Sequence, residues 1–372
     1  MRGSTIAMAD GNMGSFSGDT PVKDTPVITK ASLRAAVLGI FCFVLVGVGV
    51  STLYRANTPM PEIAVLSEKV EDYAQRDTTP DIVFLGSSQT FRHINPAIVD
   101  QTLAACGIVA ESYNFGVPAL RHPELEYIAG QVLTAAERPR LVVVQNPIRA
   151  ETVFSNMMSE RGRHFRGGAF TDAALEDVRC YTGTRMGQAR SFLNTLRAMA
   201  AEFLGLGRLA SVTVPTDPAP PPAYNEAYRS NAGFFPVEHD GNGHIVDRLA
   251  FSPMTDGIIA AGLAGEGYMP STSVAACRAR QLTDLFDRFR GAGLGVAYLV
   301  SPAPLDIAHD AVITDAVAAA NPDMAVLDFN SAEAAETYFQ RSLWYDAAHM
   351  TGEGADRLSQ AVGAQLCTVL DR

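Results

Sequence analysis

The stretch Asp81–Ser88, which reads DIVFLGSS, decides the fold. Its apolar run is short and ends at Gly-Ser-Ser, a pattern typical of a buried strand that leads into a turn. Leu141–Gln145 (LVVVQ) and Gly295–Val300 (GVAYLV) show the same continuous apolar character. Strands without polar alternation are covered on both faces, as in parallel sheets between layers of helices. These three runs therefore predict an α/β fold.

Strands and helices alternate along most of the chain. Two further short strands are expected at Val109–Asn114 and Met324–Phe329. Helical spacing of apolar residues separates the strands, and a last helix is expected over 354–370. Five strands with crossovers of this length favour a doubly wound, flavodoxin-like five-stranded parallel sheet. The alternation breaks between about 150 and 270, which we interpret as a large insertion.

An uncharged segment near the N-terminus has the length of a membrane span. Ala35–Tyr54 holds 20 residues without a charge, enough for a helix to cross a bilayer. A cleaved signal peptide is the alternative, but its apolar core is usually shorter and an Ala-x-Ala-like site follows it, unlike Ser51–Arg55 here. Lys30 and Arg34 precede the segment, so the positive-inside rule places the N-terminus in the cytoplasm and exports the rest. The expected regions are a disordered cytoplasmic tail (1–34), a transmembrane helix (35–54), a linker with a helix (55–80) and the main domain (81–372).

Composition narrows the function classes. Lys and Arg total 29 against 40 Asp and Glu, and the net charge of −11 argues against a general nucleic-acid binder, which needs cations to neutralise phosphates. Hydrophobic residues make up 47%, enough for a sizeable core. Neither a Gly-x-x-x-x-Gly-Lys loop nor zinc-ligand spacing of Cys or His occurs, and we expect no cofactor and no metal.

Four cysteines lie outside the apolar segment, which itself holds Cys42. In a flavodoxin-like winding, the helices that carry Cys106 and Cys367 lie side by side on one face of the sheet, so a disulfide between them is geometrically reasonable. Cys180 would then pair with Cys277. Because connectivity does not follow from sequence alone, four buried thiols remain the alternative.

Chemically distinctive residues follow the carboxyl ends of the expected strands. Ser88 follows the first strand, Gly116 the second and Asn146 the third, while Asp346 and His349 lie beyond the fifth. In open parallel sheets, sites form at this edge, so we expect the five residues to converge. A serine hydroxyl becomes nucleophilic when a histidine takes its proton and an aspartate holds that histidine. The N–H groups of Ser88 and Gly116 and the Asn146 amide would then stabilise an oxyanion.

At these positions the sequence resembles the SGNH, or GDSL-like, hydrolase superfamily. The matching stretches are FLGSSQTFRHINP, YNFGVPAL, VVVQNP and YDAAHMTGEGADRLS. The first stretch is most similar to a membrane-anchored subgroup that includes the D-alanyl transfer protein of teichoic acid modification and, more distantly, the alginate acetylation proteins. The usual Gly-Asp-Ser reads Gly-Ser-Ser, which leaves Ser87 at the Asp position, and the third stretch lacks the usual Gly-x-Asn-Asp. The insertion is not matched.

The resemblance implies a membrane-anchored periplasmic serine acyltransferase or esterase with Ser88, His349 and Asp346 as its triad. Its expected partners are a cell-envelope polysaccharide or acylated glycan and a multi-span membrane O-acyltransferase, and its expected location is the inner membrane. A catalytically inactive SGNH-fold scaffold or carbohydrate-binding protein of an envelope assembly complex is the alternative. For Arg121 and His122, which follow the Gly116 stretch, lining the pocket and a purely structural role stay equally open.

Each residue also has a structural interpretation. A Gly-Ser-Ser turn is common after a strand, and an Asp-x-x-His before a helix is often a helix cap. Asn146 precedes Pro147 and is also consistent with a simple strand end. The other histidines, among them His93, show no metal-ligand spacing. Only the expected convergence at one edge distinguishes the catalytic hypothesis from these interpretations.

Overall fold

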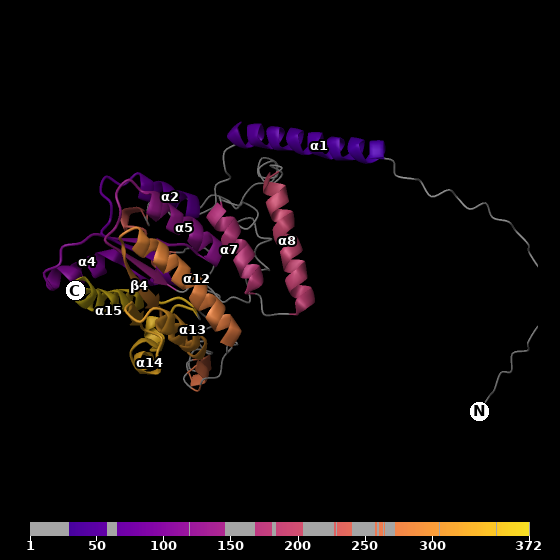
Figure 1. Ribbon diagram of the computed structural model, residues 1–372. Helices are drawn as coiled ribbons and strands as arrows, with labels where there is room; N and C mark the ends of the chain where they lie inside the picture. The colour runs from indigo at the N-terminus through magenta and orange to yellow at the C-terminus, as the bar shows by residue number, and fades with distance from the viewer. Residues whose placement is uncertain are drawn as a thin grey trace, which may run out of the picture. The chain divides into compact units, whose positions relative to one another are not determined.

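We describe a computed structural model of the chain (Figure 1). It describes residues 30–57, 65–118, 120–145, 168–180, 184–203, 227, 229–239, 257–258, 260–262, 264, 272–304, 306–346 and 348–371. The chain forms two compact units, Met1–Val50 and Ser51–Arg372, and each is described by itself. The described helices are α1 (Lys30–Asn57), α2 (Leu66–Ala74), α3 (Ser88–His93), α4 (Pro96–Ala105), α5 (His122–Thr134), α7 (Gly168–Arg179), α8 (Arg185–Phe203), α12 (Thr272–Gly291), α13 (Ile307–Ala320), α14 (Ala332–Tyr338) and α15 (Gly352–Leu370), with short 3-10 turns η3 (Val237–His239) and η4 (Arg341–Leu343).

The centre of the second unit is an all-parallel sheet of five strands in the order β2-β1-β3-β4-β5. The strands are β1 (Ile82–Gly86), β2 (Ser112–Gly116), β3 (Leu141–Gln145), β4 (Gly295–Val300) and β5 (Ala325–Asp328). This confirms the α/β class and the parallel sheet expected from the sequence.

Helices cover both faces of the sheet. Along β1, Val83 and Leu85 join one core with residues of α2, α5, α12 and α13, while Ile82 and Phe84 join the other with residues of α4, α14 and α15. Successive strand side chains point to opposite faces, so a strand buried on both sides must be apolar throughout. The uniform apolar runs of the sequence follow from this arrangement.

The second strand lies further along the chain than the sequence predicts. Expected at Val109–Asn114, it runs over Ser112–Gly116, and Val109 is 90% exposed. The ladder to β1 begins at Ile82 and Ser112, so an apolar residue ahead of it has no partner strand. Apolar character alone placed the strand start too early.

Helix α1 is longer than the expected span of 35–54. It begins at Lys30 and ends at Asn57, so residues 30–34 of the expected tail are helical. By length and composition, Ala31–Tyr54 could cross a membrane or act as a signal sequence. Residues 1–29, most of the expected disordered tail, lie outside the described residues.

Both expected cysteine pairs are present. Cys106 at the end of α4 is bonded to Cys367 in α15, with 6.4 Å between their Cα atoms. Cys180, just after α7, is bonded to Cys277 in α12, with 5.8 Å between the Cα atoms. Figure 1 shows α4 and α15 next to each other at the C-terminal end of the chain. The second bond fixes part of the insertion to the main domain.

Candidate active site

The chain turns sharply at the end of β1. Ser87 caps α3, and its Oγ accepts a hydrogen bond from the Gln89 N–H at 3.4 Å. Ser88 is the first residue of α3 and is partly exposed. N–H groups in the first turn of a helix have no intrahelical acceptor. Ser88 therefore carries both a hydroxyl group and a backbone N–H that has no acceptor within the helix.

Gln145, the buried last residue of β3, holds this turn in place. Its Oε1 accepts hydrogen bonds from the Ser87 N–H at 3.0 Å, the Ser87 Oγ at 3.2 Å and the Thr90 Oγ1 at 2.7 Å. Its Nε2 donates to Gln89 Oε1 at 2.5 Å. A Cβ on Gly86 would collide with the side chains of Thr90 and Gln145, so the close approach requires glycine. The Gln145 amide thus joins the end of β1, helix α3 and the end of β3.

A second amide, that of Asn114 in β2, holds the other end of α3. Its Nδ2 donates to the carbonyls of Thr90 and Ile94, at 2.6 Å each. Its Oδ1 accepts from the Gly116 N–H at 2.9 Å, so the donor expected for an oxyanion hole is already bonded. A Cβ on Gly116 would collide with the Phe91 backbone. Close packing of β2 against α3 therefore explains this glycine.

The loop before α15 holds a paired histidine and aspartate. His349 Nδ1 lies 2.8 Å from Asp346 Oδ2 and 3.0 Å from Oδ1. The N–H groups of Ala348 and His349 both donate to Asp346 Oδ1, at 2.8 Å each. Burial would raise the pKa of Asp346, but the His349 ring and these N–H groups outweigh it and hold the pKa below its usual value. The ionised carboxylate therefore fixes the ring.

The other ring nitrogen of His349 is unengaged. Its Nε2 is buried and has no hydrogen-bond partner among the described residues. The Ser88 hydroxyl is accordingly not bonded to it. In ligand-free enzymes such bonds are often long and tighten only when substrate is bound.

His93, the last residue of α3, supports the His349 loop. Its Nε2 accepts a hydrogen bond from the N–H of Met350, the residue after His349, at 3.0 Å. The two histidine rings are nearly perpendicular, with centroids 6.3 Å apart. Burial, followed by the nearby His349, lowers the pKa of His93 to about 3, although Asp346 opposes this. A neutral His93 keeps the lone pair that this bond needs.

One short helix therefore connects the two halves of the expected triad. α3 has 6 residues and begins at Ser88, and its end at His93 contacts the His349 loop. At 1.5 Å of rise per residue, the two ends are about 7.5 Å apart. Ser88 and the His349 loop are thus connected through α3.

Residues 229–239, part of the insertion, contact both α3 and α15. The Phe235 N–H donates to the Phe91 carbonyl at 3.2 Å, and the two rings stack with centroids 5.7 Å apart. Glu238 Oε1 accepts from the Gly352 N–H at 2.7 Å, at the N-terminus of α15. A carboxylate there is favoured by the helix dipole. This segment links the helix of Ser88 to the helix that follows His349.

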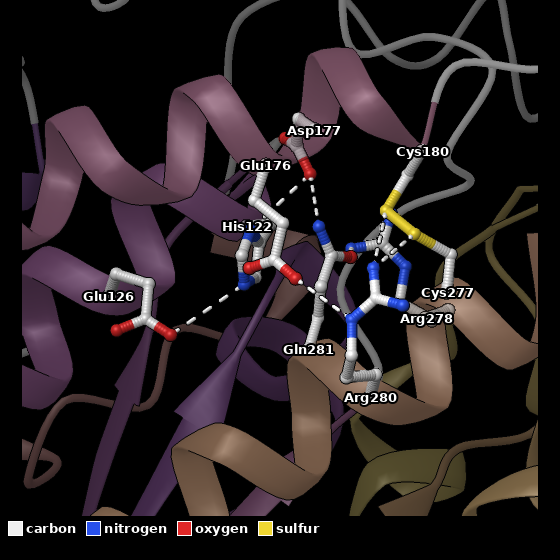
Figure 2. A network of polar contacts seen from close by, with 9 residues as sticks. All are labelled: His122, Glu126, Glu176, Asp177, Cys180, Cys277, Arg278, Arg280 and Gln281. Atoms are coloured by element: carbon white, nitrogen blue, oxygen red, sulfur yellow. Dashed lines mark hydrogen bonds and ion pairs between the residues drawn. A yellow bond between two sulfur atoms is a disulfide. The ribbon is translucent and has the colours of Figure 1, made fainter.

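A second histidine–aspartate pair lies between α5, α7 and α12 (Figure 2). His122 is buried, with Nδ1 at 3.3 Å from Asp177 Oδ1 and Nε2 at 3.6 Å from Glu126 Oε1. Gln281 donates to Asp177 at 2.8 Å and accepts from Arg278 at 2.9 Å. Burial would lower the pKa of His122, but the two carboxylates outweigh it and raise the pKa to about 9. The ring is therefore a cation within an ion network.

This network adjoins the Cys180–Cys277 disulfide. The Arg280 guanidinium lies 3.1 Å from Cys277 Sγ and 3.4 Å from a Glu176 carboxylate oxygen. A cavity of about 680 Å³ opens beside it, with His122 among its lining residues but neither Ser88 nor His349. His122 thus lines a cavity, as one interpretation expects, but not one shared with the candidate triad.

The structure pairs two of the sequence-predicted residues, His349 and Asp346, and the His349 ring lies next to His93, at the end of the helix that begins with Ser88. Arg121 is the N-cap of α5, and its N–H donates to Glu124 at 3.1 Å. Asn146 lies outside the described residues. In the part of the chain that the structure describes, no group of three or more metal-ligating side chains is found.

Sequence reasoning missed Gln145, His93 and Glu238. A signal existed for Gln145, because it is the one polar residue of an otherwise apolar strand. His93 also had one, since it precedes Ile94-Asn95-Pro96 within the resembling stretch. Nothing in the sequence pointed to Glu238, whose partner is 114 residues away.

No protein-family model matches this chain, and a search of the curated proteins finds no similar sequence.

Proposed function

We propose that this protein is a membrane-anchored SGNH-type serine acyltransferase or esterase that acts through Ser88, His349 and Asp346. The observation that supports the proposal is the His349–Asp346 pair, whose Nε2 has no partner among the described residues and whose loop contacts the short helix that begins with Ser88. A general base needs an oriented ring and a free nitrogen, and this ring has both.

In the proposed reaction, Ser88 Oγ attacks the carbonyl carbon of an ester while His349 Nε2 takes the hydroxyl proton. The tetrahedral intermediate collapses, the proton passes to the departing alcohol, and the acyl group stays on Ser88. A second hydroxyl, from a sugar or water, then gives its proton to His349 and attacks the acyl carbon. The bond from this carbon to Ser88 Oγ breaks, and His349 returns the proton to Ser88. Asp346 stabilises the cationic ring in both steps.

Charge on the oxyanion requires donors. The Ser88 N–H at the start of α3 fits this role. Gly116 would fit only if its N–H left Asn114, to which it donates in this structure. The resemblance assigns a further donor to Asn146.

The compartment proposal rests on α1 and the disulfides. Lys30 and Arg34 before the apolar stretch favour a cytoplasmic N-terminus and a periplasmic main domain at the inner membrane. Two disulfides favour an oxidising compartment. The strand order and the helices on both faces support a doubly wound, flavodoxin-like sheet.

We favour transfer to a cell-envelope polysaccharide over simple hydrolysis. A membrane tether contributes little to an esterase, but it raises the effective concentration of an acyl donor handed over by a multi-span membrane O-acyltransferase. A sugar acceptor should then release the acyl group from Ser88 faster than water does. Loss of acyl groups from the polymer in a strain without this gene would agree with transfer, and a gain would contradict it.

Labelling with a fluorophosphonate probe tests the proposed nucleophile directly. The full chain in detergent should react, Ser88→Ala should lose the label, and Ser87→Ala should keep much of it because Ser87 Oγ holds the turn without attacking. Equal labelling of the parent and Ser88→Ala would overturn the proposal.

A non-catalytic scaffold or carbohydrate-binding protein is the second candidate. The Gly116 N–H favours it, because this expected oxyanion donor is bonded to Asn114. Such a protein would not label, yet would still bind glycan.

A further inference from the structure

Helix α8 carries apolar side chains on its outer surface. Met186, Leu193, Leu196 and Phe203 are 78%, 64%, 40% and 44% exposed. Their spacing of 7, 3 and 7 residues places them along one side of the helix. Ala189 and Ala200, also exposed, fill the same side. We call these six residues the α8 stripe.

The α8 stripe is not the side that α8 uses to pack on the domain. Ser191 and Thr195 are buried, and Ala198 and Met199 pack near the buried Ala174 of α7. At 100° per residue, these packed positions lie on the opposite side of the helix from the stripe. The stripe is therefore a second apolar surface that the fold of the domain does not use.

Arginines accompany the stripe. Arg185, Arg190 and Arg197 are exposed, and Glu202 is the only acidic residue in α8. This is a local surplus of cations in a chain whose net charge is −11. Leucine and phenylalanine on one side with flanking arginines are typical of helices that lie in the interface of an anionic membrane.

The chain keeps the domain close to such a surface if α1 is a membrane anchor. Between Asn57, the end of α1, and Val65, the start of the described domain, lie seven residues. The eight steps between these two Cα atoms span at most about 29 Å when fully extended. A domain of about 300 residues has a radius of gyration of about 19 Å. The linker therefore holds the domain within about one domain radius of the bilayer, where an apolar and cationic surface can reach it.

We propose that the α8 stripe docks into the headgroup region of the anionic membrane that anchors the chain. The arginines contact lipid phosphates, and the apolar residues enter the acyl boundary. This inference rests on the membrane anchoring in the proposed function, but not on the catalytic residues. It assigns the α7–α8 part of the insertion the task of orienting the domain on the membrane.

The test uses the full chain reconstituted into vesicles of phosphatidylcholine and phosphatidylglycerol at 4:1. Leu193→Trp and Leu196→Trp should each be quenched by lipids brominated on their acyl chains, whereas Val109→Trp, an even more exposed apolar site away from α8, should not. The parent, with its buried Trp344, supplies the background. Arg190→Gln with Arg197→Gln should reduce quenching at least twofold, and phosphatidylcholine alone should have the same effect.

Three results would overturn the proposal: no quenching at positions 193 and 196, equal quenching at 109, or a blue-shifted emission without quenching, which would indicate cover by protein. Carbonate extraction of the same vesicles distinguishes the failure of the anchor from that of the docking. A chain that resists extraction but shows no quenching retains its anchor and contradicts the α8 proposal alone. An extracted chain contradicts both.

Discussion

His349 and His122 each lie against an aspartate, yet their second ring nitrogens have different surroundings. His349 Nε2 has no hydrogen-bond partner among the described residues, while His122 Nε2 lies 3.6 Å from Glu126. The first ring is held at one nitrogen by Asp346. The second is held as a cation between two carboxylates, with its pKa raised to about 9. A histidine–aspartate pair is therefore evidence for a base only when the other nitrogen is free.

The two pairs also differ in what holds each histidine ring. The His349 ring is oriented by a loop in which Asp346 accepts two backbone N–H groups. The His122 ring instead bridges α5 and α7, and Gln281 extends the network to α12. One arrangement fixes a side chain so that it can react, and the other fixes helices to one another.

The largest expected effect comes from removing each of the two histidine rings in turn. His349→Ala should lower kcat for a small activated ester at least about 10³-fold, because the base is lost. His122→Ala should leave kcat/KM within a few-fold. Steady-state hydrolysis by the full chain in detergent measures both. Comparable losses in the two variants would contradict the distinction between base and structural cation.

The next effect concerns His93, which supports only the first pair. His93→Leu removes the acceptor of the Met350 N–H and leaves that group buried without a partner, at a cost of about 1–3 kcal/mol. We expect kcat to fall about 10- to 100-fold with KM nearly unchanged, because the His349 loop shifts. His93→Gln offers an amide oxygen to the same N–H and should recover most of the rate. If both variants lose the rate equally, the hydrogen bond is not the cause.

The second pair should be visible in stability against pH. The folded pKa of His122, about 9, lies above the ordinary value of 6.5. The charged ring therefore contributes its full stabilisation below pH 6.5, and this contribution falls as the pH rises through 9. The shift corresponds to about 3 kcal/mol. The difference in unfolding free energy between the parent and His122→Gln should shrink between pH 6.5 and 9, and a difference that grows over this range would contradict the assignment.

Much of the fold follows from the sequence because strand burial on two faces leaves an unmistakable apolar run. The contact between Asp346 and His349 follows too, because only three residues separate them. The residues that hold the turn at Ser88 do not. Gln145 acts through contacts with Ser87 and Thr90, more than 50 positions away along the chain, and such pairings leave no local pattern.

One expectation was wrong, and one residue has a contact that the sequence does not reveal. The second strand starts later than Val109 because pairing with β1, not apolar character, decides where a strand begins. The expected oxyanion donor Gly116 is bonded to Asn114, two residues earlier. That contact depends on how β2 meets α3, which the sequence does not reveal. The Cys106–Cys367 pair could be predicted from the sequence, because it depends only on which two helices lie side by side.

The smallest effect on catalysis is expected from the disulfide beside the second pair. Among the residues of α7 whose burial is described, Ala173, Ala174 and Val178 are the buried apolar ones, and the Cys180–Cys277 bond and the His122 network also attach this helix. Cys180→Ser with Cys277→Ser removes a cross-link over 97 residues, which the chain-entropy model values at up to about 4.7 kcal/mol. Most of this loss of stability should appear as local opening of α7, because α7 can detach while the sheet stays folded. Hydrogen exchange should therefore accelerate in α7 and α8 and hardly change in α15, with ester turnover within about twofold of the parent.

The matched double variant at Cys106 and Cys367 should instead accelerate exchange in α4 and α15, because that bond joins helices of the core itself. If removing the Cys180–Cys277 bond slowed turnover as much as the loss of His93 does, the two histidine pairs would be coupled, and their separation into a reactive and a structural pair would be wrong.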